Sequence, residues 1–550
     1  MNKFVGTLAI NYAIFPIFFS GILLGFAWLI PPYSYPWSTF SSEFLSFIAG
    51  IILLIAMLFQ DIKIPKIQLW MLFIVIVPVV QWFMGVIDDF SIAFLALIYL
   101  LGFWLMIIAG FNLALLPKQR ELLMFGFSNL VFKVAIISSL MAILQWLNLE
   151  FYAYGIMQLN GNRPYANFGQ PNNLATFLII GLLGGLYLYE TTNIPVKKLI
   201  ICSVIILIGI ALTQSRTSWL VFIFIIAYFL YKKPLSLSFN KLFLWAGGYF
   251  ILASYLLPSI SKWIMRNFFG RITHTASILE RASSGHERIG MWLQILHAII
   301  ERPWFGYGWN QTSVAVVESI HFNTVQIWFN SAHNILLDIL VWNGIPIGLF
   351  IIMSIAVWLF WLSKNINDII SVIAILMTSA VIIHAMFEFP QRYAYFLLPT
   401  GFLLGIVQAQ TPNLKFITIN KRIFCCVLFG FVILLLLVWR DCKFLQKNSQ
   451  FIFRYESASI AFLGSNRVLF LTKFQKNLEW IEMSPRTKLS DHELNQIGYM
   501  VKNEATQYNL KKYAQILKYN GKIHNANEQL IILKKLYNQE ENLDDLDILQ

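Results

Sequence analysis

Charged residues are scarce in this sequence of 550 residues. Asp, Glu, Lys and Arg make up 12% of it, against about 25% in an average soluble domain. Hydrophobic residues make up 58%, and the mean hydropathy is +0.67. This composition excludes a soluble enzyme and a disordered chain. Repeated apolar runs of roughly 20 residues predict membrane-spanning helices instead.

Cysteine is scarce as well. The four cysteines lie in or next to apolar runs and form no CxxC pair, which excludes a disulfide scaffold and a cysteine metal site. The net charge of +13 would suit nucleic acid, but it is spread along the chain: residues 1–439 hold 24 Lys+Arg and 14 Asp+Glu, and residues 440–550 hold 16 and 13. Such a distribution reflects membrane orientation and anionic lipid, so we expect no nucleic-acid partner.

The apolar runs predict an all-α polytopic membrane protein with about 13 transmembrane helices. The first run is too long for the core of a signal peptide and ends at Pro31-Pro32, so we expect it to be retained as a helix. The predicted spans are 5–30, 43–60, 67–86, 91–112, 121–147, 173–190, 198–213, 217–231, 243–258, 333–361, 366–388, 392–410 and 423–439.

Lys and Arg in the short loops predict the orientation. With the N-terminus in the cytoplasm, the inside segments hold 14 Lys and Arg residues, whereas the short outside loops hold only Arg163, Arg216 and Arg392. This bias places the short loops around 148–172 and 389–391 on the outer side of the membrane. An odd number of spans places residues 440–550 on the outer side too.

Two of the segments predicted on the outer side are long. Residues 259–332 form a loop within a transmembrane domain of residues 1–439, and loops of this length are usually functional. Residues 440–550 are polar and form a separate helical tail, with a capping box at 490–493. The apolar spacing predicts helices at Glu493–Tyr508 and Asn527–Tyr537. Paired helices of this kind resemble tetratricopeptide repeats, although no repeat of about 34 residues is visible.

Polar residues gather on this outer side of the membrane. The densest cluster is Gly161–Asn173, which contains Asn167, Gln170, Asn172 and Asn173. Asn172 or Asn173 would cap the following helix, but capping explains only one or two of the carboxamides. The others could hold sugar hydroxyls or phosphate oxygens, so helix capping and ligand binding both stay open.

Arginine and tryptophan mark the next two clusters. Arg216 stands in the tight turn 214–218, and Arg288 and Arg302 lie in the long loop. Arginine favours bidentate contact with phosphate, although an interfacial arginine also contacts lipid headgroups. Trp292 and Trp309 could stack on sugar rings, or belong to the aromatic belt of the membrane interface.

Two histidines complete the polar set. His333 opens the tenth span in Ser331–Asn334, where it is either structural or a proton-handling group. His384 and Glu388 lie four residues apart; a structural hydrogen bond is at least as plausible as catalysis, and without a third ligand we predict no metal site. Lys133, deep in the fifth span, needs a partner or a wet cavity.

These motifs resemble a known family. The run Asn-Arg-Pro-Tyr-Ala-Asn-Phe-Gly-Gln-Pro-Asn-Asn-Leu-Ala at 162–175 is similar to the signature of bacterial O-linked protein oligosaccharyltransferases, the pilin-glycosylating ligases. The motifs at 214–218, 287–292, 302–308 and 331–334 resemble the wider O-antigen ligase and polymerase superfamily, and 384–399 resembles the protein-glycosylating branch. They occur in family order between about 160 and 400.

The resemblance implies transfer of a preassembled glycan from undecaprenyl diphosphate to Ser or Thr of a pilin-like or other periplasmic protein. It also implies a protein of the bacterial inner membrane, whose outer side, with the active site and residues 440–550, is the periplasm. It implies that Arg216 and Arg288 hold the donor diphosphate and that His333 is the essential histidine. Gln170 matches the glutamine of the signature, Tyr393 an important periplasmic tyrosine, and Glu388 is a further catalytic candidate.

The chemistry needs no cofactor, because two arginines can stabilise the departing diphosphate in place of a metal. Attack in line with the leaving group would invert the anomeric carbon. The alternatives are an O-antigen ligase acting on a lipid A core sugar, an O-antigen polymerase, and, in another class, a flippase or transporter of lipid-linked sugars. A transporter predicts inverted repeats and polar residues at the midplane, and of these only Lys133 is present.

Overall fold

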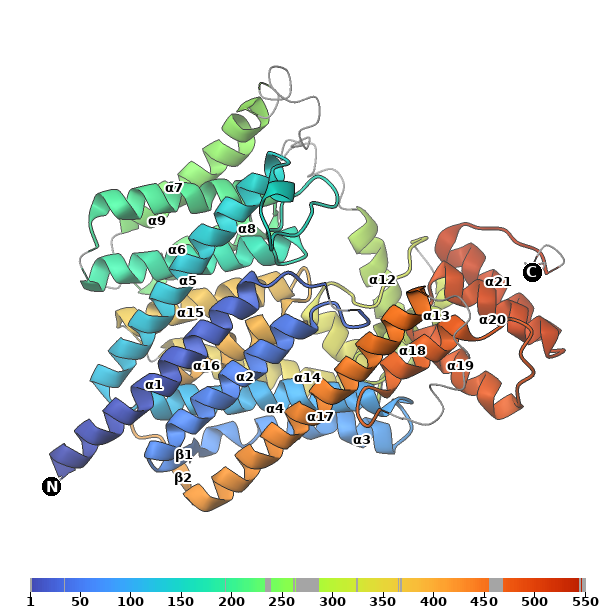
Figure 1. Cartoon of the computed structure of the whole chain (residues 1–550), viewed down its shortest axis with the longest axis horizontal. Helices are drawn as coiled ribbons and strands as arrows, with labels where there is room; N and C mark the ends of the chain where they lie inside the picture. Colours follow the sequence, from blue (N-terminus) through green and yellow to red (C-terminus); the bar gives the residue numbers. More distant parts are fainter. Residues whose placement is uncertain are drawn as a thin grey trace. The chain divides into compact units, whose positions relative to one another are not determined.

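A computed structural model describes residues 2–33, 35–192, 194–232, 239–260, 286–322, 325–364, 368–454 and 468–543, together with residues 263, 366 and 546 (Figure 1). The predictions for residues 264–285 of the long loop and 455–467 of the tail lie outside the described residues.

Helices dominate the described residues. The helices are α1 Asn2–Leu29, α2 Phe40–Ala56, α3 Met71–Phe83, α4 Phe90–Leu113, α5 Pro117–Trp146, α6 Pro171–Thr192, α7 Val196–Thr213, α8 Thr217–Lys232, α9 Phe239–Ile251, α12 His286–Glu301, α13 Thr312–Glu318, α14 Ile335–Lys364, α15 Ile369–Ala385, α16 Ala394–Gln408, α17 Lys421–Arg454, α18 Thr472–Glu482, α19 Asp491–Asn503, α20 Gln507–Tyr519 and α21 Ile523–Tyr537. Short 3-10 turns are η1 Met57–Phe59, η2 Lys66–Gln68, η3 Glu150–Tyr152, η5 Ile320–Phe322 and η6 Pro390–Arg392, and Leu252–Leu256 is a π-helical turn, η4.

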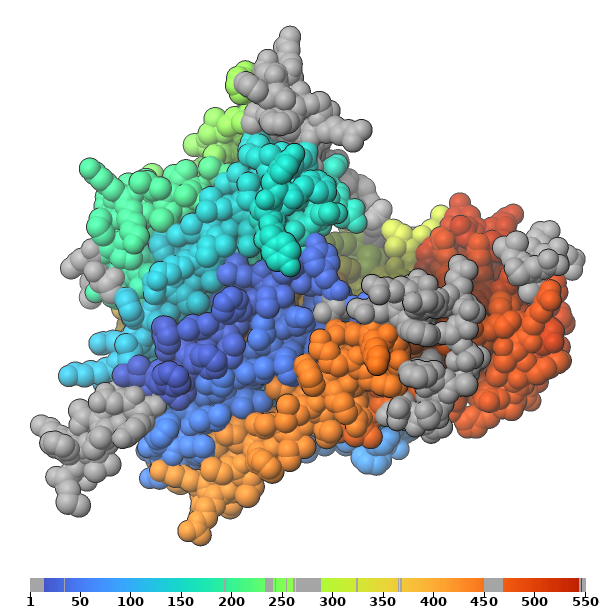
Figure 2. Space-filling model, viewed as in Figure 1, coloured from blue at the N-terminus to red at the C-terminus, as the bar shows by residue number. Residues whose placement is uncertain are grey.

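A polytopic membrane protein is confirmed. Among the described residues, eight helices are long and apolar enough to cross a membrane, and shorter apolar helices cover Ile14–Leu29, Thr217–Lys232, Ile369–Ala385 and Ala394–Gln408. The count of thirteen spans stays a prediction. Figure 2 shows α17 in orange, along which apolar side chains such as Ile423, Val427 and Phe429 are exposed, as expected of a surface that faces lipid.

The described part of the structure contains two short strands in addition to the predicted helices. The strands β1 (Ile62–Pro65) and β2 (Phe416–Ile419) pair antiparallel, with Ile62 opposite Ile419. Asn112 at the end of α4 fixes β1, because its side chain accepts a hydrogen bond from the Lys63 amide and donates one to the Lys63 carbonyl, both at 2.8 Å.

The chain divides into two compact units, and each is described by itself. Unit 1 holds residues 1–72, 99–283 and 358–436, and unit 2 holds residues 73–98, 284–357 and 437–550. The tail therefore shares a unit with the end of the long loop. The predicted boundary at residues 439 and 440 stays a prediction.

Close helix packing builds unit 1. Helices α5 and α6 approach where Gly181 faces Ala135, and a Cβ on Gly181 would lie 2.2 Å from the Ala135 Cβ. Helices α4 and α16 approach where Gly110 faces the Phe402 carbonyl, 2.1 Å from an added Cβ. Small residues allow such contacts between membrane helices, where packing drives association.

Side-chain contacts attach the tail within unit 2. Asp441 of α17 accepts hydrogen bonds from the amides of Leu469 and Phe470, at 2.8 and 2.7 Å. Asp89, just before α4, accepts from Thr472 and Lys476 of α18, both at 2.7 Å. These two carboxylates hold the start of α18.

The loop helix α13 packs against α19 of the tail. Ser313 donates its hydroxyl hydrogen to the Lys502 carbonyl at 2.7 Å, and the Lys502 ammonium lies 3.0 Å from Glu318. The capping box predicted at Ser490 is confirmed. The single helix predicted at Glu493–Tyr508 is wrong, because α19 ends at Asn503 and Thr506 caps α20.

Candidate functional site

The segment before α6 is held in place by its own carboxamides. Asn167 is buried; its side-chain amide donates to the carbonyls of Leu29 and Gly155, at 2.6 and 2.7 Å, and its oxygen accepts from the Met157 amide at 2.9 Å. All three of these hydrogen bonds join the Asn167 side chain to backbone atoms. Asn167 therefore fixes the loop against the end of α1.

Gln145 of α5 supports the same loop and was missed by the sequence analysis. Its amide donates to the carbonyls of Met157 and Ala166, both at 2.9 Å, and its oxygen accepts from the amides of Tyr165 and Ala166, at 3.0 and 2.7 Å. A glutamine inside an apolar run that directly precedes a polar loop was the only signal. Its four bonds fix Ala166, which has a φ of +49°.

Three polar side chains form a chain at the start of α6. Arg163 donates to the Thr213 carbonyl at 2.8 Å and to the Asn172 oxygen at 3.0 Å, and Asn172 donates to Glu388 at 3.2 Å. Asn172 and Glu388 are buried. Arg163 belongs to the polar cluster 161–173 but is not among the predicted site residues, yet it connects two of them with the end of α7.

The turn that follows Thr213 carries Arg216. Gln214 caps α7 in the left-handed region with a φ of +50°, and α8 begins at Thr217. The Ser215 carbonyl accepts from the hydroxyl of Tyr249 at 3.2 Å. Arg216 is exposed at this junction, so its guanidinium is accessible from outside the helix packing.

Tyr393 lies in the same part of unit 1. Its phenol is beside Asn173 and within electrostatic range of Glu388 and Arg392. Asn173 is buried. Gln170 is half-buried directly before α6, and no hydrogen bond to its carboxamide is found within the described ranges. The structure thus groups Asn172, Asn173, Glu388 and Tyr393.

The predicted His384–Glu388 pair turns towards α6. The Nδ1 atom of His384 lies 3.0 Å from the Thr176 hydroxyl, and Glu388 accepts from Asn172. In the part of the chain that the structure describes, no group of three or more His, Cys, Asp or Glu is placed to hold a metal ion.

In unit 2, His333 stands in a strained turn before α14. Its φ is +50°, its side chain is half-buried, and its amide donates to the Ser331 hydroxyl at 3.1 Å. Asn334 caps α14, because its side-chain oxygen accepts from the amides of Leu336 and Leu337, at 3.0 and 3.3 Å. The histidine therefore precedes the helix cap directly.

Helix α12 is attached to this turn. It carries Arg288, which is half-buried, and Trp292, whose indole donates to the Ala332 carbonyl at 2.9 Å. Trp292 therefore supports the turn through its nitrogen.

Arg302 and Trp309 both contact other side chains of the protein. Arg302 pairs with Glu318, and its guanidinium lies 4.6 Å from the centre of the Tyr307 ring. Trp309 is buried and packs against Trp342, with 5.4 Å between the ring centres. Phosphate binding by Arg302 and sugar stacking by Trp309 stay predictions.

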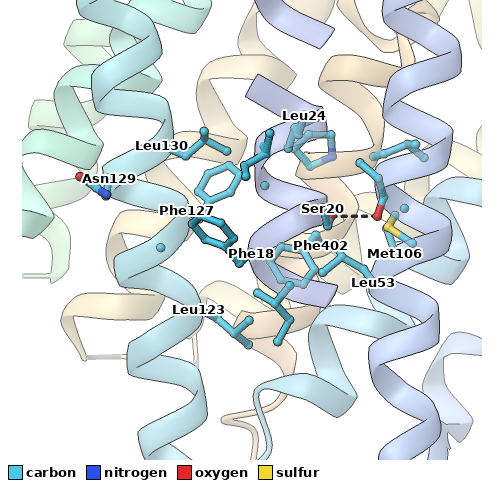
Figure 3. Close-up of a pocket in the computed structure, with 18 of the residues that line it drawn as sticks. Phe18, Ser20, Leu24, Leu53, Met106, Leu123, Phe127, Asn129, Leu130 and Phe402 are labelled. Carbon is cyan, nitrogen blue, oxygen red and sulfur yellow. Dashed lines mark hydrogen bonds between the residues drawn. The ribbon is translucent and has the colours of Figure 1, made fainter. Parts of the chain in front are cut away.

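Lys133 is exposed on α5, at the wall of an apolar pocket of about 440 Å³ in unit 1. Figure 3 shows Phe18, Phe127 and Phe402 among the residues that line it. The hydroxyl of Ser20 is bonded to the Ala49 carbonyl at 2.8 Å. With few polar groups in its wall, this pocket suits a hydrocarbon chain better than the polar solute of a transporter.

Three protein families match segments of the chain. The family described as O-antigen ligase matches residues 201–352, and the one described as virulence factor membrane-bound polymerase, C-terminal, matches residues 372–459. The family described as protein glycosylation ligase matches residues 164–189. No solved structure gives a significant match.

Two relatives match nearly the whole chain, both from Acinetobacter baylyi. A general O-oligosaccharyltransferase is 44% identical over 530 residues, which cover 96% of this chain and 93% of the relative. A ComP-specific O-oligosaccharyltransferase is 29% identical over 512 residues, which cover 89% and 90%. Together with the segment typical of protein glycosylation ligases, this similarity shows that the chain belongs to the O-oligosaccharyltransferase family of membrane glycosyltransferases.

Proposed function

We propose that this transferase moves a preassembled glycan from undecaprenyl diphosphate to Ser or Thr of periplasmic or pilin-like proteins. The observation that carries the proposal is the 44% identity to a general O-oligosaccharyltransferase over 96% of the chain. The relative named as specific for ComP is more distant, at 29%. This order favours an enzyme that glycosylates several proteins.

Arg216 and Arg288 are the proposed ligands of the donor diphosphate. Arg216 is exposed at the start of α8 and Arg288 is half-buried on α12. Guanidinium groups held on a helix or directly before one bind phosphate oxygens without a metal, and they stabilise the negative charge that grows on the leaving group. Arg302 is a weaker candidate, since its guanidinium pairs with Glu318.

The proposed reaction is a single displacement. The acceptor hydroxyl oxygen attacks the anomeric carbon while the bond from that carbon to the diphosphate oxygen breaks, and undecaprenyl diphosphate leaves with the electron pair. His333 takes the proton of the hydroxyl, or orients that hydroxyl for attack. Attack opposite the leaving group inverts the anomeric carbon.

The polar group at the start of α6 is the proposed contact surface for glycan or acceptor. Gln170, Tyr393 and Glu388 are the catalytic candidates here, and Asn172 and Asn173 are candidate glycan ligands beside them. The half-buried ring of Trp292 is a further candidate for stacking on sugar, whereas Asn167 and Trp309 are engaged in internal contacts.

The decisive experiment compares glycoproteins by mass spectrometry. The gene is deleted and complemented with the wild type, Arg216→Ala, Arg288→Ala, His333→Ala or the control Arg422→Ala, which changes an exposed arginine at the start of α17. We expect glycosylated periplasmic proteins to disappear on deletion and to return only with the wild type and the control. Loss of one such charged group typically lowers the rate by about 10²–10³-fold.

The acceptor distinguishes this proposal from its neighbours. An O-antigen ligase or polymerase, as two of the matching families are described, would leave protein glycans unchanged on deletion and alter lipopolysaccharide instead. Unchanged protein glycosylation in the deletion strain would refute the proposal. Full activity of all three variants would refute the residue roles alone.

A further inference from the structure

A buried carboxylate lies five residues after His333. Asp338, in the first turn of α14, is fully buried, and its oxygens accept three hydrogen bonds. The donors are the Thr312 hydroxyl at 2.8 Å, the Ala332 amide at 2.9 Å and the Ser331 hydroxyl at 2.6 Å. A charged acceptor gives the stronger class of hydrogen bond, so this carboxylate is the natural centre of the network.

The direction of each hydrogen bond is fixed. The Ser331 hydroxyl accepts from the His333 amide, so its single proton goes to Asp338. The Thr312 hydroxyl accepts from the Trp342 indole at 2.8 Å, so its proton also goes to Asp338. Neither an amide nor an indole nitrogen can accept. The Ala332 amide can only donate, so position 338 must carry an acceptor, and a carboxylate there satisfies all three donors at once.

Three hydrogen bonds hold the turn that carries His333. The Ala332 amide bonds to Asp338 and the Ala332 carbonyl bonds to Trp292, while the His333 amide reaches Asp338 through Ser331. The left-handed backbone of His333, with a φ of +50°, is strained in a residue other than glycine. The contacts of Asp338 offset this strain and keep the turn in one conformation.

We propose that Asp338 is the positioning residue for His333. The carboxylate fixes the backbone from Ser331 to His333 and thereby the direction in which the imidazole leaves the chain. This inference rests on the proposed role of His333 in acceptor activation. It concerns the rate of glycan transfer, since Asp338 is fully buried and acts through the backbone of the turn.

The first test is Asp338→Asn, which keeps the shape of the side chain but turns an NH2 group towards at least one of the three donors. A small misplacement of a catalytic group costs about 10²-fold in rate, so we expect kcat to fall by about 10–100-fold. The KM for an undecaprenyl diphosphate-linked oligosaccharide, extracted from the cells that make it, should change little. The acceptor is a protein identified by the mass spectrometry described above.

Asp368→Asn is the matched control. Asp368 caps α15 by accepting a hydrogen bond from the Ser371 amide at 3.1 Å, so the chemical change at a helix start is the same. We expect kcat of this variant to equal that of the wild type. A loss equal to that of Asp338→Asn would show a general effect of the substitution and would overturn the inference.

A second variant keeps the test independent of folding. Ser331→Ala removes only the link between the carboxylate and the His333 amide, and it should lower kcat by a smaller factor. In the double variant with Asp338→Asn the losses should be less than additive, because both act through one network. Hydrogen exchange of the His333 amide should accelerate in both variants.

The outcomes separate this inference from the proposed function. Wild-type kcat in Ser331→Ala and in Asp338→Asn, with His333→Ala inactive, would overturn the positioning role alone. Full activity of His333→Ala would instead refute the role of the histidine.

Discussion

Asn167 and Gln170 stand three residues apart in the same motif, and the structure gives them different surroundings. Asn167 is buried with three hydrogen bonds to the backbone, whereas Gln170 is half-buried at the start of α6. A run of carboxamides thus divides into residues that build the loop and residues that are available to a ligand.

This difference predicts opposite effects of two similar substitutions. Asn167→Ala leaves buried backbone groups unpaired and should lower the free energy of unfolding by about 1–3 kcal/mol. Gln170→Ala should leave stability within about 0.5 kcal/mol and abolish glycan transfer. Thermal unfolding of the purified protein and glycosylation in cells measure the two effects. Equal destabilisation by both substitutions would contradict the division.

The family pattern in the sequence predicted a set of candidate site residues, but it did not predict their hydrogen-bond partners. The grouping of Asn172 with Glu388 crosses more than 200 positions of sequence. Gln145 and Asp338 escaped prediction as supports, because a single polar residue in an apolar helix does not reveal the loop to which it bonds. Such long-range contacts depend on helix packing, which periodicity does not specify.

At the scale of elements, the contact between α5 and α6 depends on the absence of a side chain at Gly181. An added Cβ would lie 2.2 Å from the Ala135 Cβ and 3.2 Å from the Val131 carbonyl. Gly126, in α5, has nothing within 4 Å of the same position.

Gly181→Ala should therefore destabilise the protein by about 1–3 kcal/mol through overpacking. Gly126→Ala is the matched control and should be neutral or slightly stabilising, since alanine favours a helix over glycine. Melting temperatures in detergent measure both variants. The prediction fails if the two variants melt at the same temperature.

Asp89 gives the attachment of α18 a dependence on pH. Burial alone would raise the pKa of Asp89, but the hydrogen bonds from Lys476 and Thr472 and the charge of Lys476 outweigh it and hold the pKa below the ordinary value of 3.8. The folded state therefore binds fewer protons than the unfolded state near that pH. The stabilisation is complete above pH 3.8 and is lost as the pH falls through the lowered pKa.

We expect hydrogen exchange in α18 to accelerate below pH 3.8, after correction for the intrinsic rate, and Asp89→Asn to show the faster exchange already at neutral pH. Breaking hydrogen bonds to a charged group costs about 1.5–3 kcal/mol. Equal protection of α18 in the variant and the wild type at neutral pH would contradict this attachment.

Apolar runs predicted the helices well, because a bilayer requires long segments with internally bonded backbones. The breaks were harder to predict. Helix α14 bends at Gly344, which has a φ of +73° and lies against the backbone of Trp304. The break between α19 and α20 is set by the N-cap at Thr506, which an apolar pattern alone does not reveal.

At the scale of the whole molecule, the loop charges predict one orientation in the membrane. We expect a cysteine at Asn162, which is exposed before α6, to react with an impermeant maleimide added to intact spheroplasts. A cysteine at Lys118, exposed at the start of α5, should react only after lysis. The four native cysteines are replaced by serine beforehand. Labelling of position 118 in intact spheroplasts would reverse the predicted sides.

Helix α13 carries two neighbouring hydroxyls that bond to different partners. Thr312 bonds to Asp338, while Ser313 bonds to the Lys502 carbonyl of α19. A shortened enzyme that ends before the tail would thus lose a support of the turn that carries His333, along with any surface of the tail that binds acceptors. The loss of this support alone would be expected to inactivate the shortened enzyme. Single substitutions of exposed residues on α20 and α21 are therefore the better way to find where acceptors bind.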